Sequence, residues 1–296
     1  MSNLQSLSSS LATVLGSVAP SLVRVQSGRR VGSGLVWSED GLILTVASVL
    51  SRRGTTAVTL HDGTTHVASV VGFDRGSDVA LLRIEADGLT PANLADPELA
   101  AGNLVLVVGR PGRFARPVLG IVSAVDGPWT TRTGGTFDRF IDVEAPLPGG
   151  FGGGALVAAD GTVLGMNSRG VVRGGTTIPS QTLTRLVEQL QSGGVPRGWL
   201  GVAFQNVDLD GADFEAAGQE EALLVTGVRN GSPADDGGVR MGDALLRIDG
   251  QSVGRPDQLA AALSARVGTA STLDVLRGGA VVSLTVTPGE RKRGSA

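Results

Sequence analysis

The feature that most constrains this chain is a regular succession of short β-branched runs, each bounded by glycine or by an Asp-Gly pair. From residue 21 to residue 180 these runs recur at the spacing of antiparallel strands joined by tight turns. The 45 glycines follow no collagen-like period, so we expect them to serve such turns. The pattern therefore predicts a mainly β fold, a barrel or a sandwich, instead of a parallel α/β sheet. The clearest turn signals are Asp40-Gly41, Asp62-Gly63 and Asp160-Gly161.

Two segments outside the strands show helical spacing. Residues 1–19 are predicted to form an amphipathic helix that packs on the body of the protein or on a partner. A second helix, with Ser180 as its expected N-cap, closes the strand-rich region at residue 192. The apolar positions are Leu4, Leu7, Leu11, Leu15 and Val18 in the first helix, and Leu183, Leu186, Val187 and Leu190 in the second.

A smaller module follows the strand-rich region. Residues 193–197 form a predicted linker, and residues 198–290 combine four predicted strands with two short helices, at 232–238 and 256–264. Residues 291–296 are a predicted solvated tail. The predicted order is thus a helix at 1–19, a β domain at 20–192, a linker at 193–197 and a second domain at 198–290.

Composition excludes several classes of function. The formal net charge is -3 and 18% of the residues are charged, so the chain lacks the basic surface of a nucleic-acid-binding protein. Hydrophobic residues make up 41% of the chain but are not collected into an integral membrane span. There is no cysteine, and two histidines, His61 and His66, are too few for a Cys/His zinc site. No motif indicates a metal or an organic cofactor.

The N-terminus lacks the basic region and the continuous apolar run of a secretory signal peptide. Export is indicated only where such a leader is present. The sequence alone therefore does not establish the location of the protein, and cytoplasmic is the default prediction unless a leader or anchor precedes these residues.

Several glycine-rich motifs follow one another in a specific order. In the first module they are Arg-Arg-Val-Gly-Ser-Gly at 29–34, Asp-Gly-Leu-Ile-Leu-Thr at 40–45, Gly-Ser-Asp-Val-Ala-Leu-Leu at 76–82 and Gly-Gly-Gly-Ala-Leu-Val at 152–157. In the second module they are Gly-Trp-Leu-Gly-Val at 198–202, Gly-Ser-Pro-Ala at 231–234 and the segment 242–250. Together they resemble the HtrA (DegP-like) serine proteases. The resemblance implies a chymotrypsin-like double β-barrel followed by a smaller PDZ domain with two short helices.

The resemblance also implies where a triad of His, Asp and Ser should lie, in that chain order. Asp78 stands in the motif of the family's aspartate. Ser48 stands where the family has its histidine, and Gly152 stands where the family has its nucleophilic serine. The family's oxyanion turn is represented by Gly150, Phe151 and Gly152. Two of the three reacting side chains are therefore predicted to be absent.

This double loss predicts a pseudoprotease. In a well-studied serine protease, removing the nucleophile or the base alone lowers turnover by about 10⁶-fold, which leaves binding without useful cleavage. The chain is therefore predicted to bind peptides or unfolded proteins, as a chaperone, adaptor or regulatory subunit. The Asp78 carboxylate is expected to accept a hydrogen bond from Ser48 Oγ. His61 and His66 are expected to lie at the surface of a hairpin.

Two other functions stay open from the sequence. One is an active serine endopeptidase with an unrecognised base, and the other is a structural component of an assembly. Members of the family commonly form trimers through their N-terminal segments, so further copies of this chain or an active relative are candidate partners. Residues 1–36 contain no aromatic residue, which weakens the expectation that this chain forms the same N-terminal contact. Hydrolysis of an unfolded protein tests the first alternative, and binding of C-terminal peptides tests the second.

Peptide binding is expected at the second module. PDZ domains accept a C-terminal peptide as an added strand and hold its carboxylate with backbone N–H groups of a turn. Leu259 and Leu263 are predicted either to line a pocket for the last side chain of the peptide or to belong to the domain core. The residues that match the carboxylate-binding turn are Trp199, Leu200, Gly201 and Val202.

Restoring the missing triad side chains is expected to return little protease activity. Replacing Ser48 with His and Gly152 with Ser returns all three side chains. The sequence nevertheless predicts activity below about one per cent of an ordinary serine protease with a kcat of ~10 s⁻¹. Glycine at 152 permits backbone angles that are closed to serine, and Phe151 is expected to fill space that a substrate needs.

Overall fold

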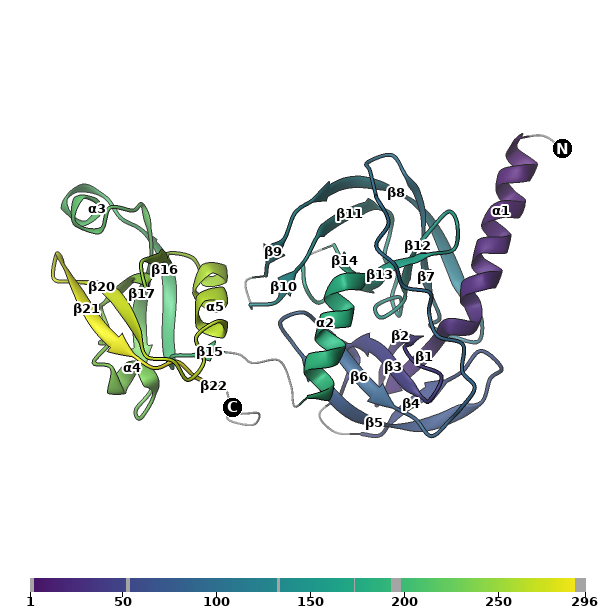
Figure 1. Ribbon diagram of the computed structural model, residues 1–296, viewed down its shortest axis with the longest axis horizontal. Helices are drawn as coiled ribbons and strands as arrows, with labels where there is room; N and C mark the ends of the chain where they lie inside the picture. The colour runs from purple at the N-terminus through teal and green to yellow at the C-terminus, as the bar shows by residue number, and fades with distance from the viewer. Residues whose placement is uncertain (1–2, 52–53, 132–133, 173, 193–197, 291–296) are drawn as a thin grey trace. The chain divides into compact units, whose positions relative to one another are not determined.

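The computed structural model describes residues 3–51, 54–131, 134–172, 174–192 and 198–290 (Figure 1). The chain forms two compact units. The predicted linker and the predicted tail lie outside the described residues. The first unit comprises residues 1–129 and 136–195, and the second comprises residues 196–296 together with 130–135.

The first unit contains the predicted double β-barrel. Its first six strands close into a barrel in the order β1-β2-β3-β6-β5-β4. They are β1 (Leu22–Ser27), β2 (Arg30–Val36), β3 (Leu42–Val46), β4 (Thr56–Thr59), β5 (Thr65–Asp74) and β6 (Val79–Arg83), with the short 3-10 helix η2 (Ala47–Val49) after β3.

The second half of this unit is a six-stranded antiparallel sheet in the order β11-β8-β7-β12-β13-β14. Its end strands β11 and β14 contact each other, so the sheet curls into the second barrel. Its strands are β7 (Leu104–Gly109), β8 (Arg116–Asp126), β11 (Phe140–Glu144), β12 (Ala155–Ala158), β13 (Val163–Ser168) and β14 (Thr176–Pro179), with β9 (Trp129–Thr130) and β10 (Thr136–Phe137) in the connection between β8 and β11.

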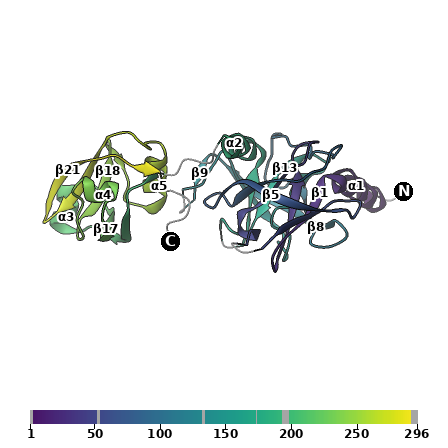
Figure 2. The ribbon, with the colours of Figure 1, turned by 90° about the horizontal axis from the view of Figure 1, so that it is seen from below.

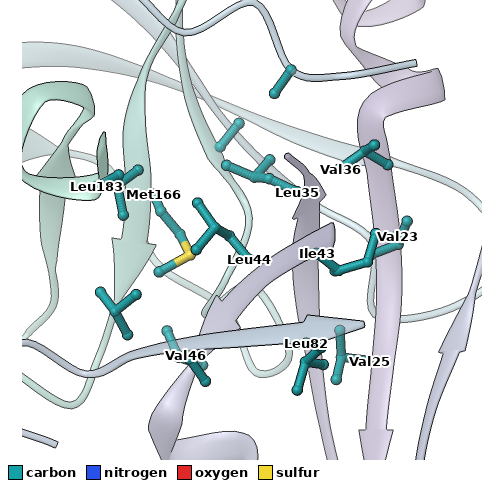
Figure 3. Packing of buried hydrophobic residues seen from close by; sticks show 14 of the residues in the cluster. Val23, Val25, Leu35, Val36, Ile43, Leu44, Val46, Leu82, Met166 and Leu183 are labelled. Carbon is teal, nitrogen blue, oxygen red and sulfur yellow. The ribbon is translucent and has the colours of Figure 1, made fainter. Parts of the chain in front are cut away.

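One continuous core joins the two barrels. Leu35 and Leu44 are fully buried in the first barrel, and Met166 of β13 and Leu183 belong to the same buried cluster (Figure 3). Burying side chains of this size stabilises a fold by roughly 1.5 to 3 kcal/mol each. Helix α2 (Ser180–Gln191) carries Leu183 and packs against β5 and β13 (Figure 2). The packing of α2 therefore helps to hold β5 and β13 in place.

The predicted N-terminal helix is confirmed as α1 (Asn3–Val18). Val14 and Val18 are buried against the core, whereas Leu4 and Leu7 are 77% and 41% exposed. The helix gives way to the 3-10 helix η1 (Ala19–Ser21), where proline prevents a regular continuation. Among the described residues, no helix combines the length and the apolar character needed to cross a bilayer.

The expected cap of α2 is wrong. Pro179 occupies the N-cap position and Ser180 is the first helical residue. The Ser180 hydroxyl instead donates to the carbonyl of Ala95 at 2.9 Å. This acceptor is distant in sequence, so helix-capping preferences could not reveal it.

The second unit has the architecture predicted for a PDZ domain, strands combined with short helices. Its main sheet has the order β16-β17-β18-β20-β21, with β19 paired to β18, and β15 pairs separately with β22. The strands are β15 (Gly198–Trp199), β16 (Val202–Asp208), β17 (Glu221–Val228), β18 (Ala244–Ile248), β19 (Gln251–Ser252), β20 (Ser271–Arg277), β21 (Ala280–Val286) and β22 (Gly289–Glu290).

Two helices were predicted for this unit, and the structure has a third. Helices α4 (Pro233–Asp236) and α5 (Pro256–Ser264) lie within or at the predicted ranges, and α3 (Gly211–Ala217) is additional. Only Ala217 of α3 is buried, so this helix lacks the apolar periodicity that would have revealed it. Ser232 caps α4 by accepting the N–H of Asp235.

Candidate functional site

Antiparallel pairing of β3 with β6 brings the end of one strand beside the start of the other. Val46 is the register partner of Val79. Ser48 in η2 and Asp78 just before β6 therefore lie next to each other. Asp78 has a left-handed φ of 56°, which aspartate tolerates better than most residues.

The Asp78 carboxylate is buried and accepts three hydrogen bonds from the described residues. Ser48 donates its N–H to Oδ1 at 2.7 Å and its hydroxyl to Oδ2 at 3.1 Å. Ser168, the last residue of β13, donates its hydroxyl to Oδ2 at 2.6 Å. These donors satisfy a charge that would be costly to bury without partners. The predicted hydrogen bond between Ser48 and Asp78 is therefore confirmed.

The part played by Ser168 was not predicted. Its only signal is the polar pair Asn167-Ser168 at the end of an otherwise apolar strand. Asn167 donates its side-chain amide to the carbonyl of Ala155, whereas Ser168 donates to Asp78. A Cβ added to Gly170 would lie 2.5 Å from Asp78 Oδ2, so the backbone at residue 170 covers the carboxylate closely.

The two histidines lie in the hairpin of β4 and β5, as predicted. His61 has its Nδ1 3.2 Å from a guanidinium nitrogen of Arg110, and His66 is paired with Val58. In the described part of the chain, neither histidine hydrogen-bonds to Asp78. No group of three or more His, Cys, Asp or Glu side chains in that part is arranged to hold a metal ion.

The turn before β12 is tied to β2 through its carbonyl groups. Ser33 of β2 donates its hydroxyl to the carbonyl of Gly150 at 2.7 Å and its N–H to the carbonyl of Gly152 at 2.8 Å. The same hydroxyl accepts the N–H of Arg110 at 2.7 Å. Ser33 therefore holds the turn in place, a role that the motif around it did not reveal.

Two N–H groups of this turn lack a protein acceptor in the described part of the chain, while the N–H of Phe151 donates to the carbonyl of Pro148 at 3.2 Å. Within the described residues, neither the N–H of Gly150 nor that of Gly152 donates a hydrogen bond. Gly150 has a φ of 82°, a conformation that favours glycine. Unpaired backbone N–H groups of such a turn are the donors from which oxyanion holes are made. The turn can therefore accept a carbonyl oxygen or a carboxylate.

Gly152 has room for a side chain. Its φ lies outside the left-handed region, and an added Cβ would lie 3.4 Å from Cγ2 of Val46, an ordinary van der Waals contact. The expectation that serine would be strained at this position is therefore wrong. The strained position is the next one. Gly153 has a φ of 88°, and an added Cβ there would lie 2.0 Å from the carbonyl oxygen of Ser33.

Phe151 does not fill space that a substrate needs. Its side chain is 2% exposed and belongs to the core of the second barrel, together with Ile141 and Leu156. It lies against Gly109, where an added Cβ would be 2.6 Å from Phe151 Cγ. The expectation was wrong because a large apolar side chain gains more from burial in the core than from a solvated cleft.

In the PDZ domain, Leu200 and Gly201 form the turn between β15 and β16. The carbonyl of Leu200 accepts the N–H of Ala234, and the carbonyl of Gly201 accepts the N–H of Arg229, both at 2.9 Å. Among the described residues, the N–H groups of Leu200 and Gly201 donate to no acceptor, although both residues are buried. Gly201 has a φ of 87°. Buried N–H groups without partners are rare, so this turn is prepared for an external acceptor.

Strand β16 lies beside this turn at the edge of the sheet. Among the described strands it pairs only with β17, which leaves its other edge for an added strand. Leu259 and Leu263 of α5 are 3% and 6% exposed and pack in the domain core with Leu200. Of the two roles predicted for these leucines, the structure supports the core role. Val202 is partly buried against the same core.

Two protein families match the chain. The trypsin-like peptidase domain matches residues 32–166, and the PDZ domain matches residues 224–277. A relative from Halomonas elongata, named a probable periplasmic serine endoprotease DegP-like, is 35% identical over 273 residues, which cover 88% of this chain and 57% of the relative. The chain spans about half the length of the curated relatives that it matches.

The names of these relatives correct the predicted location. The relatives from Halomonas elongata, Marinomonas sp. and Pseudomonas fulva are all named periplasmic. The prediction of a cytoplasmic protein is therefore wrong. It rested only on the lack of a leader-like segment, which is weaker evidence than relationship to proteins named for their compartment.

Solved structures resemble the chain over nearly all of its length. The HtrA-type protease AlgW with a decapeptide has a TM-score of 0.74 at 28% identity, and the match covers 96% of this chain and 99% of that one. A variant of AlgW with a tripeptide has a TM-score of 0.75 at 30% identity, with 96% and 98% covered. Since it matches both domain families and is 35% identical to a DegP-like relative over 88% of its length, this chain belongs to the HtrA (DegP-like) family of trypsin-fold serine proteases that carry a PDZ domain.

Proposed function

We propose that this chain is a catalytically inactive member of the family that binds peptides instead of cleaving them. The observation that carries the proposal is the Asp78 carboxylate, whose partner at residue 48 is a hydroxyl and not an imidazole. Residue 152, at the position of the nucleophile in the family motif, is a glycine and offers no reacting atom.

Neither Ser48 nor Gly152 can perform the chemistry of a serine protease. A general base must take the proton of the nucleophile near neutral pH, and an alcohol such as Ser48 is far too weak a base for this step. The Ser48 hydroxyl also donates a hydrogen bond to Asp78 Oδ2. The N–H groups of Gly150 and Gly152 can bind a carbonyl oxygen, but binding alone does not break a peptide bond.

The purified chain is expected to cleave neither casein nor small peptides, and fluorophosphonate probes are expected to leave it unlabelled. The Ser33 hydroxyl donates to a backbone carbonyl, and the Ser168 hydroxyl donates to the Asp78 carboxylate. Neither acceptor is a strong enough base to activate an alcohol near neutral pH, so the reactivity of both serines is ordinary. Mass spectrometry of probe-treated protein measures the labelling, with an active HtrA-type protease as the positive control. Stoichiometric labelling of any serine would favour the alternative, an active endopeptidase with an unrecognised base.

We further propose that peptides bind at the turn of Leu200 and Gly201. The N–H groups of these two buried residues have no acceptor among the described residues, which supports this assignment, since a terminal carboxylate supplies the missing acceptors. The free edge of β16 supports it as well, because an extended peptide can pair there as an added strand. Two AlgW structures are described as holding a decapeptide and a tripeptide, which supports a ligand of the same kind.

Peptides with a free apolar C-terminus are expected to bind the full chain about tenfold or more tightly than the same peptides with an amidated C-terminus. Charge-assisted hydrogen bonds to a carboxylate contribute roughly 1.5 to 3 kcal/mol, and a neutral amide forms weaker ones. Isothermal titration calorimetry compares the two forms directly. Equal affinities would remove the carboxylate assignment of the turn.

The surface of α1 favours an additional role in assembly. Leu4 and Leu7 are exposed on this helix, and exposed apolar side chains gain from being covered by a partner. We propose that α1 joins further copies of this chain or an active relative, so that peptide binding is the activity of an assembly. We also propose a periplasmic location, on the strength of the relatives' names.

A further inference from the structure

We propose that the first unit binds an amphiphilic organic anion, an acidic head group on an apolar chain, in a cleft between helix α1 and the loop that follows β7. The cleft has a volume of about 990 Å³, which is the size of a small-molecule site. Neither Asp78 nor the turn at Gly150–Gly152 contributes a described residue to its lining. The site is therefore separate from the degenerate triad and from the proposed peptide site in the second unit.

The cleft carries an excess of positive charge, although the formal net charge of the whole chain is -3. Three arginines line it, Arg24, Arg110 and Arg113, together with a single acid, Asp62. Arg24 of β1 donates its Nε–H to the carbonyl of Pro111 at 3.1 Å, which ties the loop after β7 to the first barrel. Within the described ranges, none of the three arginines forms an ion pair. An anionic head group in the cleft therefore finds cationic partners that the protein has left uncompensated.

Arg110 is buried, and this makes its unpaired charge the strongest evidence for an anion. The residue is 3% exposed. Its guanidinium donates to the carbonyls of His61 at 2.9 Å and Arg113 at 2.7 Å, and it lies 3.2 Å from Nδ1 of His61, so its partners are carbonyls and an imidazole and not a carboxylate. Its Nε has no hydrogen-bond partner among the described residues. Burial lowers the pKa of Arg110 from its ordinary value, and the charge of Asp62 offsets this effect only in part. Since a buried charge without an opposite charge is costly, an anion in the cleft would supply the missing compensation.

The side of the cleft formed by α1 is apolar. This helix carries no charged residue, and it lines the cleft with small or apolar side chains. On the loop side, the ring of Phe114 also lines the cleft and is 69% exposed. Apolar surface beside arginines fits a ligand whose chain covers the former and whose head group pairs with the latter. The lining residues of α1 and of η1 after it are Ala12, Leu15, Gly16 and Ala19.

Isothermal titration calorimetry of the full chain with decanoate, below its micelle-forming concentration, tests the inference. Acetate has the same head group without the chain, and decyltrimethylammonium has a chain of the same length with the opposite charge. Gly16→Leu fills the cleft, because a Cβ added to Gly16 meets no heavy atom within 4 Å, and its control Thr13→Leu adds the same side chain at an exposed position of α1 outside the lining. Arg110→Gln removes the buried charge, and its control Arg116→Gln removes the charge of an exposed arginine outside the lining.

Decanoate is expected to bind the unmodified chain about tenfold or more tightly than acetate or decyltrimethylammonium, because both the buried chain and the charge-assisted hydrogen bonds contribute. Gly16→Leu and Arg110→Gln should each weaken decanoate binding by about tenfold or more, whereas both control variants should stay within about twofold of the unmodified chain.

Gly16→Leu decides the test, since Arg110→Gln also removes the contacts of Arg110 with its own loop. Gly16→Leu keeps every arginine and places a better helix former in α1, so its folding is not at risk. Equal binding of decanoate and decyltrimethylammonium, or of decanoate and acetate, would overturn the inference. A decanoate affinity that Gly16→Leu leaves unchanged would do the same, because the ligand would then lie elsewhere, for example at the turn of Leu200 and Gly201. None of these results removes the proposed peptide binding, which rests on a different unit.

Discussion

A chain carrying both Ser48→His and Gly152→Ser is expected to hydrolyse casein about a thousandfold or more faster than the unmodified chain. Loss of a base or a nucleophile lowers turnover by about 10⁶-fold in a well-studied serine protease. Restoring both side chains can therefore raise turnover over a comparably wide range. Even partial recovery within that range is easily measured, because the unmodified chain is expected to give no signal above background.

Three features prepare the framework for this gain. Asp78 Oδ2 already faces residue 48, where it accepts the Ser48 hydroxyl at 3.1 Å. The N–H groups of Gly150 and Gly152 are unpaired within the described residues, so an oxyanion can be received. Among the described residues, an added Cβ at residue 152 meets only the side chain of Val46, at 3.4 Å from Cγ2 and 3.9 Å from Cγ1. The weak activity predicted from sequence assumed strain at 152 and a cleft filled by Phe151, and neither obstacle exists.

Each single variant serves as a control for the double variant. Ser48→His alone lacks a nucleophile and Gly152→Ser alone lacks a base, so both are expected to stay at background, since triad residues act as a unit. Labelling of the double variant by a fluorophosphonate should occur at residue 152 alone. A double variant that keeps its circular dichroism spectrum but neither cleaves casein nor takes up the probe would show that the turn is not arranged for catalysis.

Gly153→Ala is expected to destabilise the first unit by about 4 kcal/mol or more, whereas Gly152→Ala should change its stability by no more than about 1 kcal/mol. At Gly153 the left-handed φ of 88° and the carbonyl of Ser33, 2.0 Å from an added Cβ, both oppose a side chain. At Gly152 the backbone is ordinary and the new Cβ finds a normal contact.

Urea unfolding followed by circular dichroism compares these two variants with the unmodified chain. The pair is closely matched, since the same atoms are added to neighbouring glycines of one turn. Because the effect at Gly153 could leave the unit unfolded from the start, a readable transition of Gly152→Ala keeps the comparison informative. Equal unfolding midpoints for the two variants would contradict the backbone course described for the turn.

Much of the fold could be predicted because its signals are local. The turn signal Asp62-Gly63 lies in the hairpin of β4 and β5, and Gly63 has the left-handed φ of 95° that such turns require. The predicted helix at 256–264 coincides with α5, whose first residue is a proline. The contact between Asp78 and Ser48 was also predicted, because the order of the family motifs put both residues at triad positions.

What escaped prediction depends on contacts between residues far apart in sequence. The hydrogen bond from Ser168 to Asp78 joins residues 90 positions apart, and that from Ser33 to Gly150 joins residues 117 apart. A single serine after a strand carries no mark of such a partner. Phe151 was misjudged for a related reason, since only the three-dimensional course of the turn shows that its side chain points into the core.

The turns at Gly150–Gly152 and Leu200–Gly201 share one arrangement. Their carbonyl groups accept hydrogen bonds from the protein, and two N–H groups in each, those of Gly150 and Gly152 and those of Leu200 and Gly201, are unpaired among the described residues. Their donors belong to the main chain, which most substitutions leave untouched, and only proline removes a backbone N–H outright. Cleavage, by contrast, depends on particular side chains, and a single codon change can abolish it. In the descent of such a protein, loss of catalysis and loss of ligand reception are therefore separate events, and the first can be complete while the second has not begun.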